Sequence, residues 1–473
     1  MKYLLLLLLP LQLLAQERAV LLRNVNVVDV ETGTVRTGQH VLVSGNRIER
    51  ITSKAITRKG ARVVDGSGKF LIPGLWDMHV HVFNNISGLP PNEYYHPLFL
   101  ANGVTSVREM WTKPGSLHHV RRWRSESATG SRPVPRYASV GTLVDGVPAT
   151  WPNSDTVRTA AEARALVREV KASGVDFFKV YGQLSRETYA AIADECRKLN
   201  FPFAGHVPEG MTMAEASAAG QRSQEHLGYW AMFAELSDQQ QKFRGLKPSE
   251  LTPALRIELL QSVSAQKASA LAAVLNRNRT AFCPTIVQFR ATVLGDDPSI
   301  REDGRLQFTD SMDRADWTEF ARRFTPGNRT LREARFRKSL DVVRMLHENG
   351  VLVLAGTDLG NPFVYAGSSL HDELSLFVEA GLSPLAALQT ATLNAARFLG
   401  KEREIGTVTQ GKLADLVLLE ANPLADIANA RKIHAVVMNG KLLTRADLDA
   451  LQQDAKAQIR ALGQGVQSGA TGR

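Results

Sequence analysis

The sequence predicts an α/β protein: a (β/α)8, TIM-like barrel with a small β-sandwich domain built from both chain ends. Apolar, strand-like runs alternate with helical patterns through the middle of the chain, which is typical of parallel βα units. Short β-rich runs separated by tight turns occur near both ends. With 473 residues, 44% of them hydrophobic, the chain is long enough to bury a barrel core and a second, smaller one.

Residues 1–15 predict a signal peptide. Lys2 precedes a mostly apolar run at residues 4–14, and Ala15-Gln16 offers a cleavage point. Because about 20 apolar residues are needed to span a bilayer, this run is too short for a membrane anchor. We therefore expect a secreted or periplasmic protein that makes no membrane contact after the signal is removed.

The β-sandwich is expected to form from residues 16–73 and 401–445. Its strand candidates are 19–30, 41–43, 47–51, 414–419, 435–438 and 441–444. Asn439-Gly440 lies between the last two, and Asn-Gly between apolar runs is a strong hairpin signal. Neither set of strands can close a core alone, so the two ends should meet. For 446–473 we expect a helix to about Leu462 and then a flexible Gly/Ser-rich tail.

Residues 74–400 are assigned to the barrel. The eight strand candidates are 74–82, 104–109, 138–143, 177–181, 203–206, 223–226, 281–286 and 351–357. Helical patterns include 161–173, 186–199, 336–349, 370–380 and 383–399. A doubly wound open sheet is the alternative, but no glycine-rich phosphate loop follows the first strand.

The segment 230–335 breaks the alternation of strands and helices. It contains a long helical pattern at 252–278 and a polar, Arg-rich stretch at 295–328. We expect a helical insertion on the active-site face, which is either a lid or a surface elaboration.

The formal net charge of +10 is spread along the chain, and no zinc-finger or RNA-binding motif accompanies it. The sequence therefore does not indicate nucleic-acid binding, and the charge favours anionic substrates only mildly. The two cysteines, Cys196 and Cys283, are expected to be buried free thiols.

Potential metal ligands coincide with the ends of the predicted strands. His79 and His81 are two residues apart, so their side chains share one face of an extended strand. The other candidates, which end or follow strands four, five, six and eight, are Lys179, His206, His226 and Asp358. Each alone has a structural interpretation, such as a hydrogen-bonded histidine or a helix cap. Because the carboxyl ends of barrel strands face one mouth, together they could form a site for zinc or a related divalent ion.

These residues resemble the amidohydrolase superfamily. The matching features are Pro-Gly-x-x-Asp-x-His-x-His at 73–81, the strand-four lysine, the histidines that close strands five and six, and the aspartate that closes strand eight. Further matches are Glu373-Leu374, Ala-Thr-Leu-Asn-Ala-Ala at 391–396 and Gly-Lys-Leu-Ala-Asp-Leu-Val at 411–417. The chain looks most similar to the imidazolonepropionase-related, Xaa-Pro dipeptidase (prolidase-like) branch.

The resemblance implies two divalent metal ions, with Zn²⁺ as the expected metal. His79, His81 and Asp358 would bind the more buried ion, and His206 with His226 the more exposed one. Lys179 would be N6-carboxylated, so that its carbamate bridges both ions. A hydroxide shared by the metals would attack the substrate, with Asp358 as acid and base. Tyr229 would hydrogen-bond the oxyanion, or else be a packed loop aromatic.

We therefore expect an exported, binuclear metal-dependent amidohydrolase that hydrolyses an amide C–N bond, in an Xaa-Pro dipeptide or an N-acyl amino acid. The expected partner is this small molecule. The sequence does not decide the oligomeric state and allows a homo-oligomer. His206-x-x-Glu209 also matches mononuclear deaminases and cyclic-amide hydrolases of the superfamily, which generally lack the strand-four lysine. A third interpretation is a non-enzymatic binding protein built on a barrel that has lost its catalytic activity, although a scaffold has no chemical need for metal ligands.

Overall fold

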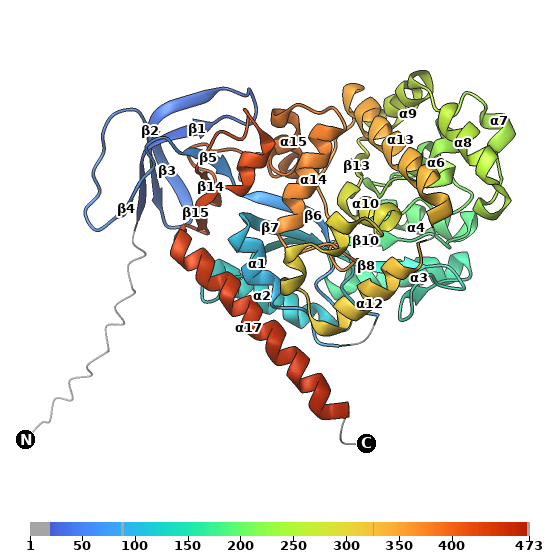
Figure 1. Cartoon of the computed structure of the whole chain (residues 1–473), viewed down its shortest axis with the longest axis horizontal. Coiled ribbons are helices and arrows are strands. Elements are labelled where there is room, and N and C mark those ends of the chain that lie inside the picture. The colour runs from blue at the N-terminus through green and yellow to red at the C-terminus, as the bar shows by residue number, and fades with distance from the viewer. Residues whose placement is uncertain (1–18, 87–88, 325, 471–473) are drawn as a thin grey trace, which may run out of the picture.

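The computed structural model describes residues 19–86, 89–324 and 326–470 (Figure 1). The expected signal peptide at 1–15 lies outside the described residues, as does the end of the predicted tail at 471–473. Two sheets organise the described chain, one from its two ends and one from its middle. No helix in these ranges is long and apolar enough to cross a membrane.

The first sheet joins both ends of the chain, as predicted. Its strands are β1 (Val20–Val28), β2 (Val35–Ser44), β3 (Arg47–Thr52), β4 (Arg62–Asp65), β5 (Phe70–Pro73), β14 (Leu416–Leu419), β15 (Ile433–Met438) and β16 (Lys441–Thr444). The order is β16-β15-β14-β5-β1-β2-β3, with β4 against β1. β5 and β14 are antiparallel, with Leu71 opposite Leu418. Both of these leucines belong to a separate apolar core shared by the two chain ends.

The second sheet is the barrel. Its strands are β6 (Leu75–Val80), β7 (Val104–Glu109), β8 (Arg136–Asp145), β9 (Asp155–Thr156), β10 (Phe177–Val180), β11 (Phe203–Gly205), β12 (Ser223–Glu225) and β13 (Ala281–Cys283). Neighbouring strands pair in parallel in the order β13-β12-β11-β10-β8-β7-β6, with the short β9 beside β8. Seven predicted strands are therefore present, and the α/β barrel with a second sheet is confirmed.

The eighth predicted strand forms isolated bridges instead of a continuous ladder. On one side Val353 pairs with Phe282 of β13. On the other side the Asp358 N–H donates to the His79 carbonyl of β6 at 2.8 Å. Gly356 permits this close approach, because a Cβ there would lie 2.8 Å from the Cβ of His79. The segment closes the barrel between its last and first strands.

Helices surround the barrel sheet, as Figure 1 shows. They are α1 (Tyr95–Ala101), α2 (Leu117–Thr129), α3 (Ala160–Ser173), α4 (Arg186–Lys198), α5 (Met213–Ala218), α13 (Arg329–Glu348), α14 (Ser368–Glu379), α15 (Pro384–Thr390) and α16 (Leu393–Leu399). Short 3-10 helices are η1 (Pro114–Ser116), η2 (Pro248–Glu250), η3 (Gly304–Phe308), η4 (Pro326–Asn328) and η5 (Ile427–Arg431). The single helix predicted at 383–399 is two helices, because Thr392 has φ −136° and ψ −90°, outside the helical region.

The expected insertion is two helical blocks separated by β13. The first holds α6 (Trp230–Glu235), α7 (Gln240–Phe243), α8 (Pro253–Gln261) and α9 (Ala265–Asn278); the second holds α10 (Ile286–Leu294), α11 (Pro298–Arg301) and α12 (Ser311–Arg322). The helix predicted at 252–278 is interrupted because the Ser264 side chain caps a new helix, α9. In the second block Trp317 packs against Phe363 and Tyr365, in the loop after Asp358. The second block therefore rests on the loop that carries a predicted ligand.

The C-terminal helix α17 (Arg445–Ala470) runs past Leu462, further than the predicted helix. It lies along α1, and Lys456 Nζ is 4.9 Å from the ring centre of Phe308 in η3 (Figure 1). The prediction for the cysteines is confirmed, since Cys196 and Cys283 are both free and buried.

Candidate metal centre

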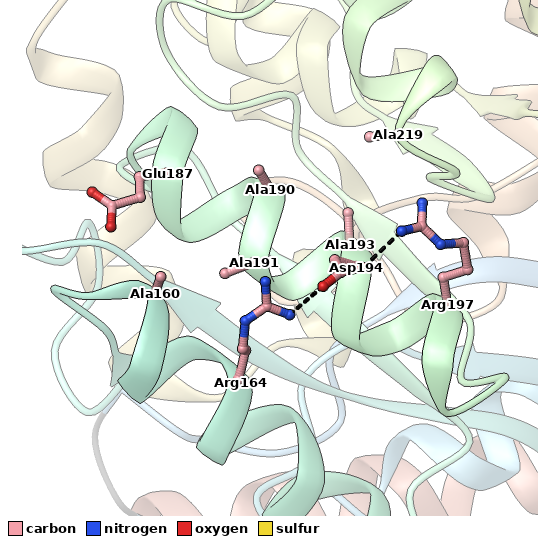
Figure 2. A pocket seen from close by; sticks show the side chains of 9 residues that line it. All are labelled: Ala160, Arg164, Glu187, Ala190, Ala191, Ala193, Asp194, Arg197 and Ala219. Atoms are coloured by element: carbon pink, nitrogen blue, oxygen red, sulfur yellow. Dashed lines mark hydrogen bonds and ion pairs between the residues drawn. The ribbon is translucent and has the colours of Figure 1, made fainter.

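One surface groove of the described chain is not at the strand ends. It lies between α3 and α4 on the outside of the barrel (Figure 2). Arg164 and Arg197 line it, and both pair with Asp194. Because its charged groups neutralise one another and the predicted ligands are elsewhere, we place the functional site at the strand ends instead.

Five of the predicted ligands meet at the carboxyl ends of the barrel strands. Asp358 Oδ1 lies 3.3 Å from His79 Nε2 and 3.2 Å from His81 Nε2. Asp358 Oδ2 lies 3.6 Å from His226 Nδ1, and Lys179 Nζ lies 3.3 Å from His79 Nε2. Ligand atoms of His79, His226 and Asp358 all lie within 4.8 Å of one another, and all three residues are buried. One cation could contact all three.

His206 extends this cluster by one imidazole. Its ring centre is 4.5 Å from that of His226 and 3.8 Å from that of Tyr181. The Nδ1 atom of His206 is buried and has no hydrogen-bond partner in the described chain. Because an unpaired buried polar atom is costly, the position fits a histidine that completes its bonding with a metal ion.

The protonation states of these groups suit metal binding. Burial lowers the pKa of Lys179 to about 8, although Asp358 opposes the shift. Burial, helped by the Lys179 charge, lowers the pKa of His81 to about 4. Burial alone would raise the pKa of Asp358, but His226, His81 and Lys179 outweigh it and hold that pKa at about 2. Neutral imidazoles and an ionised carboxylate are the forms that bind metals, so the donor set fits a divalent ion.

Two residues that the sequence analysis missed hold His79 in place. His79 Nδ1 lies 3.0 Å from Glu225 Oε2, and Arg108 NH2 donates to both Glu225 oxygens at 2.9 and 2.8 Å. All three side chains are buried. A carboxylate behind a ligating histidine fixes the orientation and tautomer of the ring. Only their positions near strand ends could have indicated these two residues from the sequence. Glu225 directly precedes His226, and Arg108 is the penultimate residue of β7.

Two more buried carboxylates connect the strand ends. Asp77 accepts hydrogen bonds from the Thr357 N–H at 3.0 Å and the Thr357 hydroxyl at 2.7 Å. Glu109 accepts from the Val82 N–H at 2.8 Å and lies 4.0 Å from His81 Nδ1. Burial raises the pKa of Asp77 and of Glu109 to about 7. Asp77 belonged to the motif at 73–81, but the sequence assigned it no role.

The main chain is strained at two of the predicted ligands. His226 has φ +71° and Asp358 has φ +57°, in the left-handed region that side chains rarely adopt. His226 Nδ1 lies 2.8 Å from Thr285 Oγ1, just before α10. Glu373 on α14 accepts from the first two N–H groups of α10, at 2.9 and 2.7 Å. The buried Glu373 thereby fixes the turn that carries Thr285.

The remaining predicted residues lie at the edge of the cluster. Tyr229 directly precedes α6, is 43% exposed, and has its ring centre 6.1 Å from that of His206. Glu209 is exposed, and its backbone N–H donates to Gly182 O at 2.8 Å. Within the described ranges its carboxylate makes no ion pair with the histidines. The geometry thus places Tyr229 beside the centre and leaves Glu209 outside the contacts of the cluster.

Short stretches of the chain are similar to curated enzymes. Imidazolonepropionase of Rubrobacter xylanophilus is 42% identical over 104 residues, which cover 21% of this chain and 25% of that enzyme. Adenine deaminase of Clostridium botulinum is 38% identical over 68 residues, or 14% of this chain and 10% of that enzyme. The chain therefore matches a quarter or less of the length of these two relatives.

Solved structures share the fold over nearly the whole chain. Bottromycin amidohydrolase superimposes with a TM-score of 0.72 at 24% identity, over 93% of this chain and 91% of that one. A Xaa-Pro dipeptidase with bound methionine in its active site gives a TM-score of 0.64 at 20% identity, over 90% of this chain and 100% of that one. Residues 70–443, which include every predicted ligand, match the Amidohydrolase family as a whole. On that match, the chain belongs to the amidohydrolase family.

Proposed function

We propose that this chain is an exported, binuclear metal-dependent hydrolase that cleaves an amide C–N bond, with an Xaa-Pro dipeptide or an N-acyl amino acid as substrate. One observation carries the two-metal proposal: a fully buried lysine amine lies 3.3 Å from the Nε2 of a histidine that is itself part of the cluster. A scaffold gains nothing from this arrangement, because a buried ammonium beside imidazoles is unfavourable.

Lys179 is well placed to be carboxylated. Its lowered pKa, near 8, leaves part of the amine neutral at physiological pH. A neutral amine adds to CO₂, forms an N–C bond and releases one proton, which gives an anionic carbamate. His79, His81 and Asp358 would hold one divalent ion, His206 and His226 the second, and the carbamate would contribute an oxygen to each. Bound divalent ions, Zn²⁺ in our proposal, lower the pKa of water and polarise a carbonyl.

The side chains of the chain itself would move the protons. Asp358 is ionised and lies within 3.6 Å of three imidazoles, so it can accept a proton from water and deliver it to the leaving nitrogen. The Tyr229 hydroxyl would donate a hydrogen bond to the oxyanion. Glu225 and Arg108 would keep the His79 ring fixed while this occurs.

The names of similar proteins support amide hydrolysis but leave a second candidate. Bottromycin amidohydrolase and the Xaa-Pro dipeptidase share the fold, whereas adenine deaminase shares a short stretch of sequence. The exposed position of Glu209 favours hydrolysis of an amide over deamination. The proposed secreted or periplasmic location follows from residues 1–15 alone.

A substrate screen combined with Lys179→Ala tests the proposal. Protein reconstituted with zinc in bicarbonate buffer should bind two metal ions per chain and hydrolyse Xaa-Pro dipeptides or N-acyl amino acids. Lys179→Ala should lose one metal and lower kcat/KM by more than about 10²-fold, because even residues behind a ligand cost up to about that factor. The exposed Lys198→Ala, on α4, is the matched control. One metal per chain, indifference to Lys179→Ala and ammonia release from adenine would instead establish the deaminase.

A further inference from the structure

Arg335 differs from the other arginines of α13 because it has no acidic partner among the described residues. Its helix neighbours pair with carboxylates of Asp296, Asp297, Glu333, Asp341 and Glu348. Arg335 makes one hydrogen bond within the described chain, from Nε–H to the Gly228 carbonyl at 2.8 Å. The two terminal nitrogens of its guanidinium are therefore left for another acceptor.

Aromatic rings hold this guanidinium in a fixed place. Its central carbon lies 5.0 Å from the ring centre of Trp230 and 5.0 Å from that of Phe289. Phe289 packs so closely on Gly228 that a Cβ at that glycine would lie 2.1 Å from the ring. Rings that restrict an arginine reduce the entropy lost when its planar fork binds a ligand.

A second arginine, Arg256, adds positive charge beside the same indole. Arg256 lies over the Trp230 ring at 5.1 Å, and its Nε is buried with no hydrogen-bond partner in the described part of the chain. Burial and the Arg256 charge lower the pKa of Arg335 to about 10. Two guanidinium groups therefore lie beside one indole, and no carboxylate of the described chain pairs with Arg335. This leaves a local excess of positive charge that an anion would neutralise.

This positive site adjoins the proposed metal centre. Gly228, which binds Arg335, is two residues after the ligand His226 and directly precedes Tyr229. The Tyr229 ring centre lies 6.1 Å from that of His206, which belongs to the more exposed pair of proposed ligands. A substrate whose carbonyl reaches that pair would therefore extend its far end past Tyr229 toward Arg335.

We propose that Arg335, with Arg256 beside it, binds the free carboxylate of the amino acid that leaves in the reaction. This inference rests on the proposed hydrolysis, and it names the residues that would recognise the free carboxylate shared by the proposed substrates. A guanidinium can bind a carboxylate through two parallel hydrogen bonds, which selects carboxylate-bearing substrates over their neutral analogues.

The test compares L-leucyl-L-proline with L-leucyl-pyrrolidide, which lacks only the carboxylate. Wild-type protein should prefer the dipeptide, and Arg335→Gln should reduce the kcat/KM ratio of the two substrates about 10- to 100-fold, mainly through the KM of the dipeptide. Arg335→Lys should retain part of the preference, because it keeps the charge but not the fork. Any loss of folded protein affects both substrates alike and cancels in the ratio. The exposed Arg337→Gln, two positions along α13, should keep the wild-type ratio.

Two results separate this inference from the proposed function. If the wild-type protein hydrolyses both compounds and Arg335→Gln leaves their ratio unchanged, the carboxylate site is wrong while the hydrolase stands. If the screen finds no hydrolysis at all, calorimetric titration with L-proline and with pyrrolidine still decides the anion site. Tighter binding of proline by wild type than by Arg335→Gln supports the site, and equal binding by the two proteins overturns it.

Discussion

Glu225 accepts hydrogen bonds from three side chains at the base of the centre. Arg108 binds both of its oxygens, His79 binds one, and the Ser223 hydroxyl donates to the other. Glu225→Gln should leave Arg108 buried without its counter-ion, which costs about 3–5 kcal/mol of unfolding free energy. It should also weaken metal binding by about 10- to 100-fold, because His79 loses its carboxylate.

Denaturant unfolding and competition with a metal chelator measure these two effects. Glu215→Gln is a suitable control, since Glu215 forms an exposed ion pair with Arg186. A Glu225→Gln protein with wild-type metal affinity would mean that Glu225 does not orient His79.

That the candidate ligands lie close together could be predicted from the sequence, whereas the residues that hold them in place could not. His79, His81, His206, His226 and Asp358 lie at strand ends, and strand ends share one mouth of a parallel barrel. Arg108 and Glu225, by contrast, are 117 residues apart and meet only because of how the strands are arranged in the closed barrel. No local pattern distinguishes Arg108 from a surface arginine.

The start of α10 is linked by hydrogen bonds to His226, one of the predicted ligands. Glu373 accepts from the N–H groups of Ile286 and Val287, and the preceding Thr285 bonds to His226. Glu373→Ala should leave two buried donors unsatisfied, at about 1–3 kcal/mol each, and should loosen the turn. We expect faster hydrogen exchange at residues 285–287 and weaker binding of the more exposed metal.

Glu373→Gln is the matched control, because its amide oxygen can still accept from the α10 main chain. It should show a smaller increase in exchange than Glu373→Ala. If both variants exchange as slowly as wild type, the helix start does not depend on Glu373.

At the level of elements, periodicity predicted most strands and helices but not their interruptions. The Thr252–Asn278 pattern is continuous in hydrophobicity, yet Ser264 caps a second helix within it. The eighth strand is apolar and was expected to form a ladder, but its contacts with β6 and β13 are isolated bridges. The Ser264 cap is a local hydrogen bond from the Lys267 N–H, whereas the isolated bridges depend on tertiary contacts. Neither is visible in the hydrophobic pattern, which reports burial and not where main-chain pairing stops.

A polar cluster of Arg136, Asp415 and Asn439 joins the two sheets. Arg136 of β8 donates to the Asp415 carboxylate and, at 2.7 Å, to the Asn439 side chain of the terminal sheet. The Asp415 carbonyl accepts from the Gly74 N–H, just before β6, at 2.7 Å. The motif at 411–417 and the Asn-Gly turn therefore join the chain ends to the barrel, which explains why neither end needs to fold alone.

The whole molecule should lose stability in mild acid because it buries neutral histidines away from the centre. Burial lowers the pKa of His96 to about 3 and that of His371 to about 4. Below their usual pKa, near 6.5, the unfolded chain takes up protons that the folded chain does not. The stabilisation is therefore complete above about pH 6.5 and declines as the pH falls toward 4.

Each of these histidines should lower the free energy of unfolding by about 2 kcal/mol between pH 7.5 and pH 5, since one pKa unit corresponds to about 1.4 kcal/mol. His371→Gln isolates one contribution, because an amide can replace the contact of His371 Nε2 with Asn102 O, 2.9 Å apart. Urea unfolding at the two pH values should show that the free energy of unfolding falls by about 2 kcal/mol less in this variant than in the wild type. Both proteins carry the same metal ligands, so acid release of metal affects them equally and the difference belongs to His371. An identical loss in the two proteins would show that His371 is protonated in the folded state or accessible to water.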